Sequence, residues 1–196
     1  RCKGHSMLIT LVDLEREPVR FDLELAPGAI DFGDLALQTS PLAVHGLAEV
    51  LHEHRGPKEI IADIRARASW SGAFEAPCAR CLEPVRHPLD GDFDLLFRPL
   101  GADAGPPDRS LGAPETEIGY YQGEGLVLED VLREQVLLAL PARSLCRTDC
   151  KGLCPRCGRN LNSESCTCDT APADQRWSAL SDLRSRLSQP PPPGKD

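Results

Sequence analysis

Hydrophobic and polar residues alternate along much of the first hundred positions, and this period of two predicts β-strands that bury one face. Even-numbered apolar residues from Ile60 to Trp70 share one predicted face. Residues 42–51 are apolar and fit either a strand or a helix. The other predicted strands cover residues 7–12, 16–25, 59–74 and 85–99. The turn between the last two contains Cys78 and Cys81, so we expect an antiparallel pair joined by a cysteine-bearing turn.

The pattern changes to helical spacing over residues 126–140, and Pro141 ends this predicted helix. Residues 101–119 are rich in Gly, Pro and Asp and predict a loop. A last helix is expected after the N-cap Asp174, and the proline-rich residues 190–196 predict a disordered tail.

The predicted fold class is α+β: an antiparallel β-sheet, twisted or partly closed, with one packed helix, a C-terminal cysteine-rich zinc module and a terminal helix. The expected domains are a β-rich domain at 7–141, the zinc module with its helix at 142–188 and a tail at 189–196.

Composition narrows the class of protein. The 196 residues carry a formal charge of −8 and are 41% hydrophobic with 5% aromatic residues. Such acidity disfavours broad contact with a phosphate backbone, and so few aromatics provide no platform for stacking bases. No apolar stretch is long enough to cross a membrane and no secretory leader is evident, so we expect a cytoplasmic protein with reduced thiols.

Cysteine spacing carries the strongest chemical signal. Six of the nine cysteines fall in residues 146–168. A C-x2-C turn points two thiolates the same way, so that they can share one tetrahedral zinc ion. Pro155 and Gly158 suit such a turn. We therefore expect a first zinc site formed by Cys154, Cys157, Cys166 and Cys168.

The remaining cysteines suggest a second site. Cys2 lies in the six residues before Met7 and is left out of the ligand count. The four that are then unassigned predict a second zinc ion, which would clamp the strand turn onto the end of the 126–140 helix. These ligands are Cys78, Cys81, Cys146 and Cys150. The rival interpretation is a single zinc with other ligands from the C-terminal six, and Cys78 and Cys81 as a redox pair.

The cysteine sets indicate structural rather than catalytic metal. No histidine lies within them, and four thiolates leave no open coordination position for water. The histidines elsewhere, such as His87, are interpreted as lone surface residues. The sequence also has no nucleophile-elbow, P-loop or dinucleotide-binding motif, so we expect no enzyme activity.

Taken together, these motifs resemble those of a known bacterial family, YceD, the large ribosomal RNA subunit accumulation proteins. The resemblance rests on Cys78-Ala-Arg-Cys81-Leu-Glu-Pro, on the helix that ends at Leu-Ala-Leu-Pro141, and on the signature that runs from Cys150 through Cys157-Gly-Arg-Asn to Cys166 and Cys168. It covers roughly residues 60–187. Gln175 stands where proline is common in the family.

The resemblance implies a non-enzymatic role in 23S ribosomal RNA accumulation and large-subunit assembly. Structural zinc would present a surface to precursor RNA or to a basic ribosomal protein such as a zinc-ribbon one. The residues expected to make the contact are Lys151, Arg156, Arg159 and Asn160. The alternative is a redox- or zinc-responsive regulator that acts through its cysteine thiolates.

Overall fold

The computed structural model describes residues 7–54, 60–102, 118–168 and 180. Contacts within the chain group Arg1–Gly152 into one compact unit and Leu153–Asp196 into a second. Residues 142–152, which were expected in the cysteine-rich module, therefore belong to the first unit. The expected final helix and tail lie outside the described residues, except for Leu180, which is helical.

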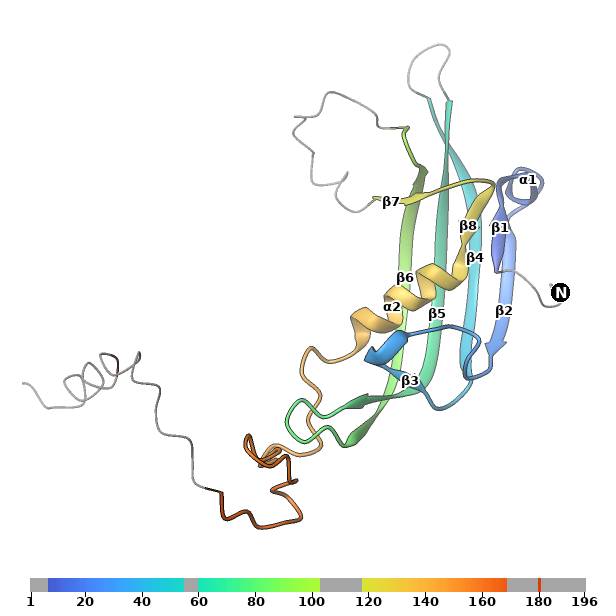
Figure 1. The fold of residues 1–196 in the computed structure, drawn as a ribbon. Coiled ribbons are helices and arrows are strands. Elements are labelled where there is room, and N and C mark those ends of the chain that lie inside the picture. The colour runs from blue at the N-terminus through green and yellow to red at the C-terminus, as the bar shows by residue number, and fades with distance from the viewer. Residues whose placement is uncertain (1–6, 55–59, 103–117, 169–179, 181–196) are drawn as a thin grey trace, which may run out of the picture. The chain divides into compact units, whose positions relative to one another are not determined.

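A curved β-sheet forms most of the first unit (Figure 1). Its strands run in the order β2-β4-β5-β6-β7, and β3 pairs with β5 outside this path. The bounds are β2 Val19–Leu25, β3 Leu37–Gln38, β4 Leu42–His54, β5 Ile60–Pro77, β6 Pro84–Pro99 and β7 Ile118–Tyr121. All pairs are antiparallel except β6 with β7. The predicted antiparallel sheet is thus present in most of its pairs, and the parallel pairing of β7 makes the sheet mixed.

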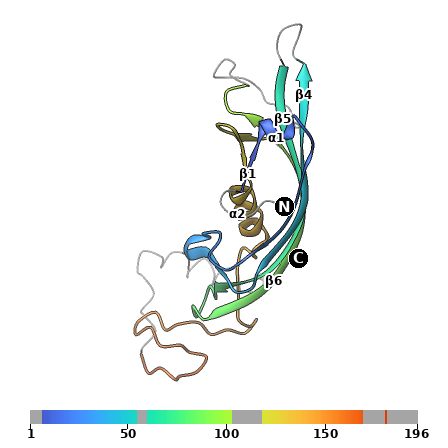
Figure 2. The ribbon, with the colours of Figure 1, turned by 90° about the vertical axis from the view of Figure 1, so that its right-hand side faces the viewer.

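Helix α2, Leu128–Ala139, covers one face of this sheet, and Figure 2 shows it on the concave side together with β1. Val131, Leu132 and Val136 of the helix are buried in the same hydrophobic core as Phe93 and Phe97 of β6. Burying a side chain of this size contributes about 1.5–3 kcal/mol, so this face stabilises the unit.

The first unit also contains a second sheet of two short strands, a short helix and a 3-10 turn. Strand β1, Leu8–Thr10, pairs antiparallel with β8, Gly125–Val127. Helix α1, Leu11–Leu14, follows β1, and the Thr10 hydroxyl accepts a hydrogen bond from the Asp13 N–H as its cap. A 3-10 turn, Gly33–Leu35, precedes β3.

Most predicted elements are present, with shifted ends. The ambiguous segment 42–51 is strand β4. The predicted strand at 7–12 ends at Thr10, because α1 begins at Leu11. The predicted helix at 126–140 begins only at Leu128, because the residues before it pair with β1. Strand β7 begins at Ile118, so the loop predicted at residues 101–119 was wrong for residues 118 and 119.

The predicted face of β5 holds from Ile64 to Trp70 but not at its beginning. Ile60 is exposed, whereas Asp63 on the opposite face is buried. The Arg98 guanidinium donates two hydrogen bonds to Asp63, with Nε–Oδ1 at 3.0 Å and Nη2–Oδ2 at 2.8 Å, and its Nη2 also donates to Glu53. A buried carboxylate requires such a partner, so this ion pair explains the exception.

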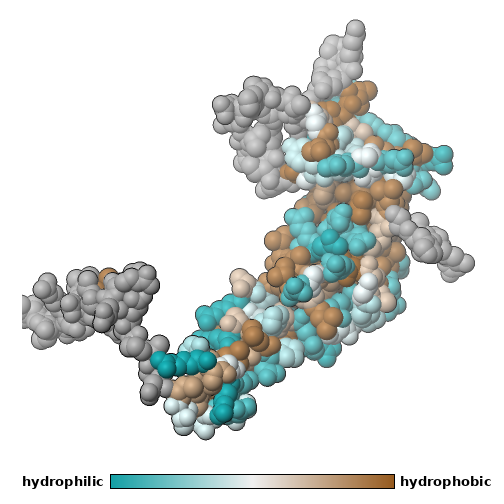
Figure 3. Space-filling view, in the orientation of Figure 1, coloured by the Kyte–Doolittle hydropathy of each residue, from teal (hydrophilic) through white to brown (hydrophobic). Residues whose placement is uncertain are grey.

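The exposed surface does not separate into one polar and one apolar region. Figure 3 shows polar and apolar side chains interspersed on the face of the first unit that carries α2. None of the helices that the structure describes has the length and apolar character needed to cross a bilayer.

Candidate metal centres

Four cysteines from two distant segments meet at one end of the first unit, and we call them the split set: Cys78, Cys81, Cys146 and Cys150. The first two lie in the turn between β5 and β6, and the other two follow α2. Their four Sγ atoms lie within 4.8 Å of one another. Three of the four residues are buried, and Cys146 is exposed.

Backbone hydrogen bonds shape the turn that carries the first two sulfurs. The Leu82 N–H donates to the Cys78 carbonyl at 3.0 Å, and the Cys78 N–H donates to the Glu83 carbonyl at 2.8 Å. These bonds close a tight loop that requires a left-handed backbone at Leu82, whose φ is +63°. The loop holds the sulfurs of Cys78 and Cys81 on one side.

A second group of contacts docks the segment after α2 onto this turn. The Ala79 N–H donates to the Ser144 carbonyl at 2.8 Å, and Arg80 Nη1 donates to the Cys150 carbonyl at 2.7 Å. The ring of His87, on β6, is 2.8 Å from the Ser144 hydroxyl through Nε2. Four sulfurs from residues up to 72 positions apart are thereby held together by contacts outside the sulfurs themselves.

Four further cysteines gather in the second unit, and we call them the C-terminal set: Cys154, Cys157, Cys166 and Cys168. The Gly158 N–H donates to the Cys154 carbonyl at 2.9 Å, and the Cys154 N–H donates to the Arg159 carbonyl at 2.8 Å. These are the same two bonds as in the first turn, and Gly158 has φ +72° where Leu82 has +63°. The two C-x2-C turns are therefore built alike.

The sulfur spacing fits a tetrahedral metal site. Zinc–sulfur bonds of about 2.3 Å at tetrahedral angles place neighbouring sulfurs about 3.8 Å apart, whereas a disulfide bond is about 2.05 Å long. In the split set, Cys78 and Cys150 are 3.9 Å apart and Cys81 and Cys146 are 3.6 Å apart. The shortest recorded contact in the C-terminal set, Cys166 to Cys154, is 3.4 Å. All the described cysteines are free thiols, and each set can hold one ion.

The electrostatics of both sets also favour a bound cation. Hydrogen bonds to its sulfur, chiefly from the Cys146 N–H at 3.4 Å, lower the pKa of Cys78 to about 6. The backbone N–H of Cys157 does the same for Cys154, whose pKa falls to about 6. Conversely, the neighbouring sulfurs, Cys166 first, raise the pKa of Cys168 to about 12. Four crowded thiols cannot all ionise without a compensating positive charge, which a divalent metal would supply.

The structure thus brings together both predicted groups of four sulfurs, and their role as metal ligands stays a prediction. Of the residues expected to contact a partner, Lys151 is exposed in the first unit, and Arg156 and Arg159 are exposed in the second. Asn160 is half-buried, and its side-chain oxygen accepts a hydrogen bond from the Asn162 N–H at 3.0 Å. This bond gives Asn160 a role in its own turn.

Sequence reasoning missed the residues that support the split set. His87 is half-buried against Ser144 rather than a lone surface residue. Gly152 has φ +76°, and a Cβ there would lie 3.0 Å from the Arg80 carbonyl oxygen. The signal for Arg80 was its place inside the C-x2-C turn, but nothing local indicated that Ser144 or Gly152 would lie beside it.

Comparisons with known proteins agree with these motifs. The family model described as "Large ribosomal RNA subunit accumulation protein YceD" matches residues 66–184. An uncharacterized protein of Mycobacterium tuberculosis is 32% identical over 80% of this chain and 65% of its own length. One of Mycobacterium leprae is 31% identical over 74% of this chain and 68% of its own. The chain thus spans about two thirds of these mycobacterial relatives.

A chloroplast relative carries the family name. The "Large ribosomal RNA subunit accumulation protein YCED homolog 1, chloroplastic" of Arabidopsis thaliana is 34% identical over 30% of this chain and 18% of its own length. No solved structure matches the chain.

Proposed function

Because the chain belongs to the YceD family of large ribosomal RNA subunit accumulation proteins, we propose that it is a non-enzymatic factor in 23S ribosomal RNA accumulation and large-subunit assembly. The observation that carries the mechanism is the gathering of eight cysteine sulfurs into two compact sets of four. Closed sets of this kind suit a protein that presents a surface rather than one that turns over a substrate.

Each set would bind one zinc ion. Tetrahedral sites made of four thiolates favour zinc among the common divalent ions, because soft sulfur ligands bind it strongly. Four thiolates fill the coordination shell and leave no position where water could be activated. The metal would therefore order the polypeptide, and the chemistry it supplies is ligation alone.

The two ions would have different structural roles. In the split set, zinc would join the turn between β5 and β6 to the segment that follows α2, adding to the hydrogen bonds of Ala79 and Arg80. In the C-terminal set, zinc would replace a hydrophobic core, since Cys154 is the one buried residue among the described residues 153–168.

Charge indicates what kind of contact the ordered surface would make. Arg156 and Arg159 are exposed beside the C-terminal set, and Arg159 lies 3.8 Å from Glu164. A zinc ion with four thiolates carries a formal charge of about −2, which offsets much of this positive charge. The chain as a whole carries −8. A local contact through these arginines, together with acidic surfaces that attract a basic ribosomal protein, fits this distribution better than broad binding to RNA.

Sedimentation with large-subunit precursors tests the proposal. The zinc-loaded chain should migrate with precursor particles in a sucrose gradient of cell extract and should bring down large-subunit RNA or proteins. Arg156→Glu with Arg159→Glu should weaken the association, while Arg16→Glu with Arg20→Glu, at two exposed positions of the first unit, serves as the control of equal charge change. Absence of the chain from precursor fractions would refute the assembly role.

Metal analysis tests the zinc assignment separately. Native mass spectrometry should find two zinc ions per chain, and serine at any one of the eight ligand positions should remove one of them. A single ion per chain would refute one of the two sites. Retention of both ions by Cys81→Ser would refute the assignment of the split set.

A second candidate function, a redox- or zinc-responsive regulator, is favoured by the exposure of Cys157 and Cys168. Thiolates that oxidants can reach are open to attack even when they bind metal. This function requires that dilute peroxide release zinc within minutes and weaken the precursor association in the same period. If zinc stays bound while the association is unchanged, the assembly factor is the better description.

A further inference from the structure

The two C-x2-C turns differ at one position in a way that folding does not explain. Both need a left-handed residue directly after the second cysteine. The C-terminal turn uses Gly158 there, which adopts this conformation at low cost, but the first turn uses Leu82. The Leu82 side chain is 65% exposed, so burial in the core does not compensate for the strained backbone. An exposed leucine kept in a strained conformation indicates a role outside folding.

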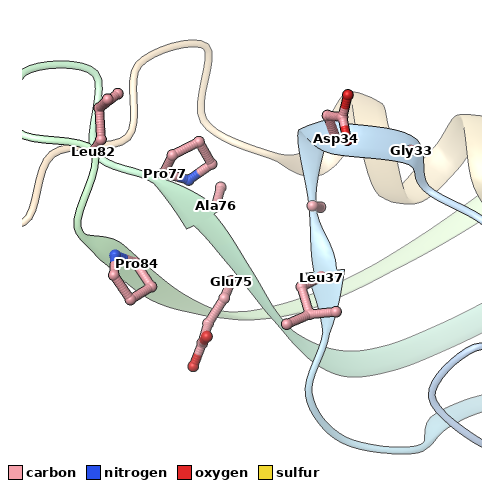
Figure 4. Close-up of a pocket in the computed structure, with 9 residues that line it drawn as sticks. Gly33, Asp34, Leu37, Glu75, Ala76, Pro77, Leu82 and Pro84 are labelled. Carbon is pink, nitrogen blue, oxygen red and sulfur yellow. The ribbon is translucent and has the colours of Figure 1, made fainter.

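Leu82 borders a shallow hollow of about 290 Å³. Figure 4 shows Leu37 of β3 on one side of it and Leu82, Pro77 and Pro84 at the turn on the other. Leu37 is also 65% exposed. The hollow is close to the lower limit of small-molecule pockets and is open, so it suits one or two side chains of a partner better than a whole metabolite.

The charged residues that line the hollow are both acidic. Asp34 lies in the 3-10 turn and Glu75 on β5, and the other lining residues are apolar or glycine. An apolar floor with carboxylates at its border attracts a segment in which apolar side chains stand next to Lys or Arg. The same carboxylates repel phosphate groups, which argues against RNA in this position.

We propose that this hollow, formed by Leu37, Leu82, Pro77 and Pro84 with Asp34 and Glu75, binds a short basic and apolar segment of a protein partner. The inference rests on the proposed function in one respect: ribosomal proteins are rich in such segments, and the hollow would be where the factor holds one of them. Because Leu82 follows Cys81 directly, zinc in the split set would hold its side chain in position for binding.

Fluorescence anisotropy with three labelled synthetic peptides of equal length tests the site on the full zinc-loaded chain. The first alternates leucine with lysine, the second leucine with glutamate and the third serine with lysine. The leucine–lysine peptide should bind most tightly. Equal binding of the serine–lysine peptide would show attraction by net charge alone, and equal binding of the leucine–glutamate peptide would show a merely apolar contact. Either result overturns the proposal.

Variants then locate the binding. Leu82→Gly should keep the fold, because Gly158 occupies the equivalent position of the other turn, and Leu37→Thr keeps a residue suited to a strand. Each variant should lower the affinity for the leucine–lysine peptide by about tenfold, as expected for a central interface residue. Leu100→Ala is the matched control, since Leu100 is an exposed leucine just beyond the opposite end of β6. Unchanged binding in Leu82→Gly at an unchanged melting temperature would refute the site.

Removing the two negative charges at the border of the hollow separates the contribution of charge to peptide binding from that of apolar contact. Asp34→Asn with Glu75→Gln should reduce the preference for the leucine–lysine peptide over the leucine–glutamate one, and added salt should reduce it further. If a large-subunit RNA fragment displaces the peptide, and Leu82→Gly weakens binding of that RNA rather than of the peptide, the hollow is a nucleic-acid site and the proposal is wrong.

The peptide assay and the precursor assay fail independently. A chain that binds the peptide but does not migrate with precursor particles would lose the assembly role and keep this site. A chain that migrates with precursors equally well with Leu82 or Gly at position 82, and binds no peptide, would keep the assembly role and lose this site.

Discussion

Replacing Cys157 by serine should unfold the described part of the second unit and leave the first unit intact. The reason is the near absence of a core: Cys154 is the one buried residue in the described stretch 153–168. Without a core, hydrogen bonds and the metal must offset the loss of conformational freedom. The neighbouring variant Ser165→Ala, which changes an exposed residue of the same stretch, should have no such effect.

The magnitudes support this expectation. Ordering the backbone of these residues costs about 1 kcal/mol each at the low end, or on the order of 16 kcal/mol in all. The turn hydrogen bonds around Cys154 and Asn160 contribute about 1 kcal/mol each, roughly 5 kcal/mol together. Zinc in small cysteine-rich peptides contributes about 10–16 kcal/mol. We therefore expect the stretch to be folded with the ion and unfolded without it.

Three measurements check this prediction together. Native mass spectrometry of Cys157→Ser should find one zinc ion in place of two. Limited proteolysis should cut within residues 153–168, and the melting temperature of the β-sheet, followed by circular dichroism, should stay within about 2 °C of the unchanged chain. If the variant keeps both ions, or if residues 153–168 resist proteolysis without zinc, the reasoning from the missing core is refuted.

Further predictions concern the order of metal loss and the first unit. A competing chelator should remove zinc in two phases, first from the C-terminal set and then from the split set. The reason is that three of the four cysteines in the C-terminal set are at least partly exposed, whereas the split set exposes only Cys146. In a stopped-flow assay, Cys157→Ser should lack the fast phase and Cys81→Ser should keep it. Asp63→Ala should lower the free energy of unfolding in urea by about 3–5 kcal/mol, because it leaves the buried Arg98 without its bidentate partner. Adding Arg98→Met should restore much of the loss, and a single-variant loss below about 1 kcal/mol would contradict this account. Gly46→Ala should destabilise the sheet by about 1–3 kcal/mol, since its Cβ would lie 2.6 Å from the Arg67 carbonyl oxygen. The same urea assay checks it, with Ser69→Ala at an exposed position of β5 as the comparison.

Local patterns predicted the elements better than their surroundings. Period-two alternation located β2, β5 and β6, because successive side chains of any strand point to opposite faces. The same signal could not locate β7, which is short and pairs in parallel with a strand that precedes it by about twenty residues. Nor did it show that the residues before α2 form β8, since β8 exists through its pairing with β1.

The candidate site divides in the same manner. The C-terminal set was readable because its ligands lie within 15 residues, so local turns alone bring the sulfurs together. For the split set, counting cysteines suggested the grouping, and the structure places all four sulfurs within 4.8 Å of one another, while their role as metal ligands stays a prediction beside the rival redox pair. Ser144, His87 and Gly152 had no local signal, because their role depends on a contact between segments far apart in the chain.

By itself the sequence determined the strands β2, β5 and β6, the helix α2 and the number of cysteines able to form metal sites, since each follows from spacing along the chain. Only the tertiary structure showed that the four sulfurs of the split set lie together, why Asp63 is buried, and that Leu82 and Leu37 border one hollow. Spacing constrains a residue relative to its near neighbours, whereas sheet register and the docking of the segment after α2 depend on the energy of the whole fold. The hollow that we propose as a partner site is a feature of this second kind.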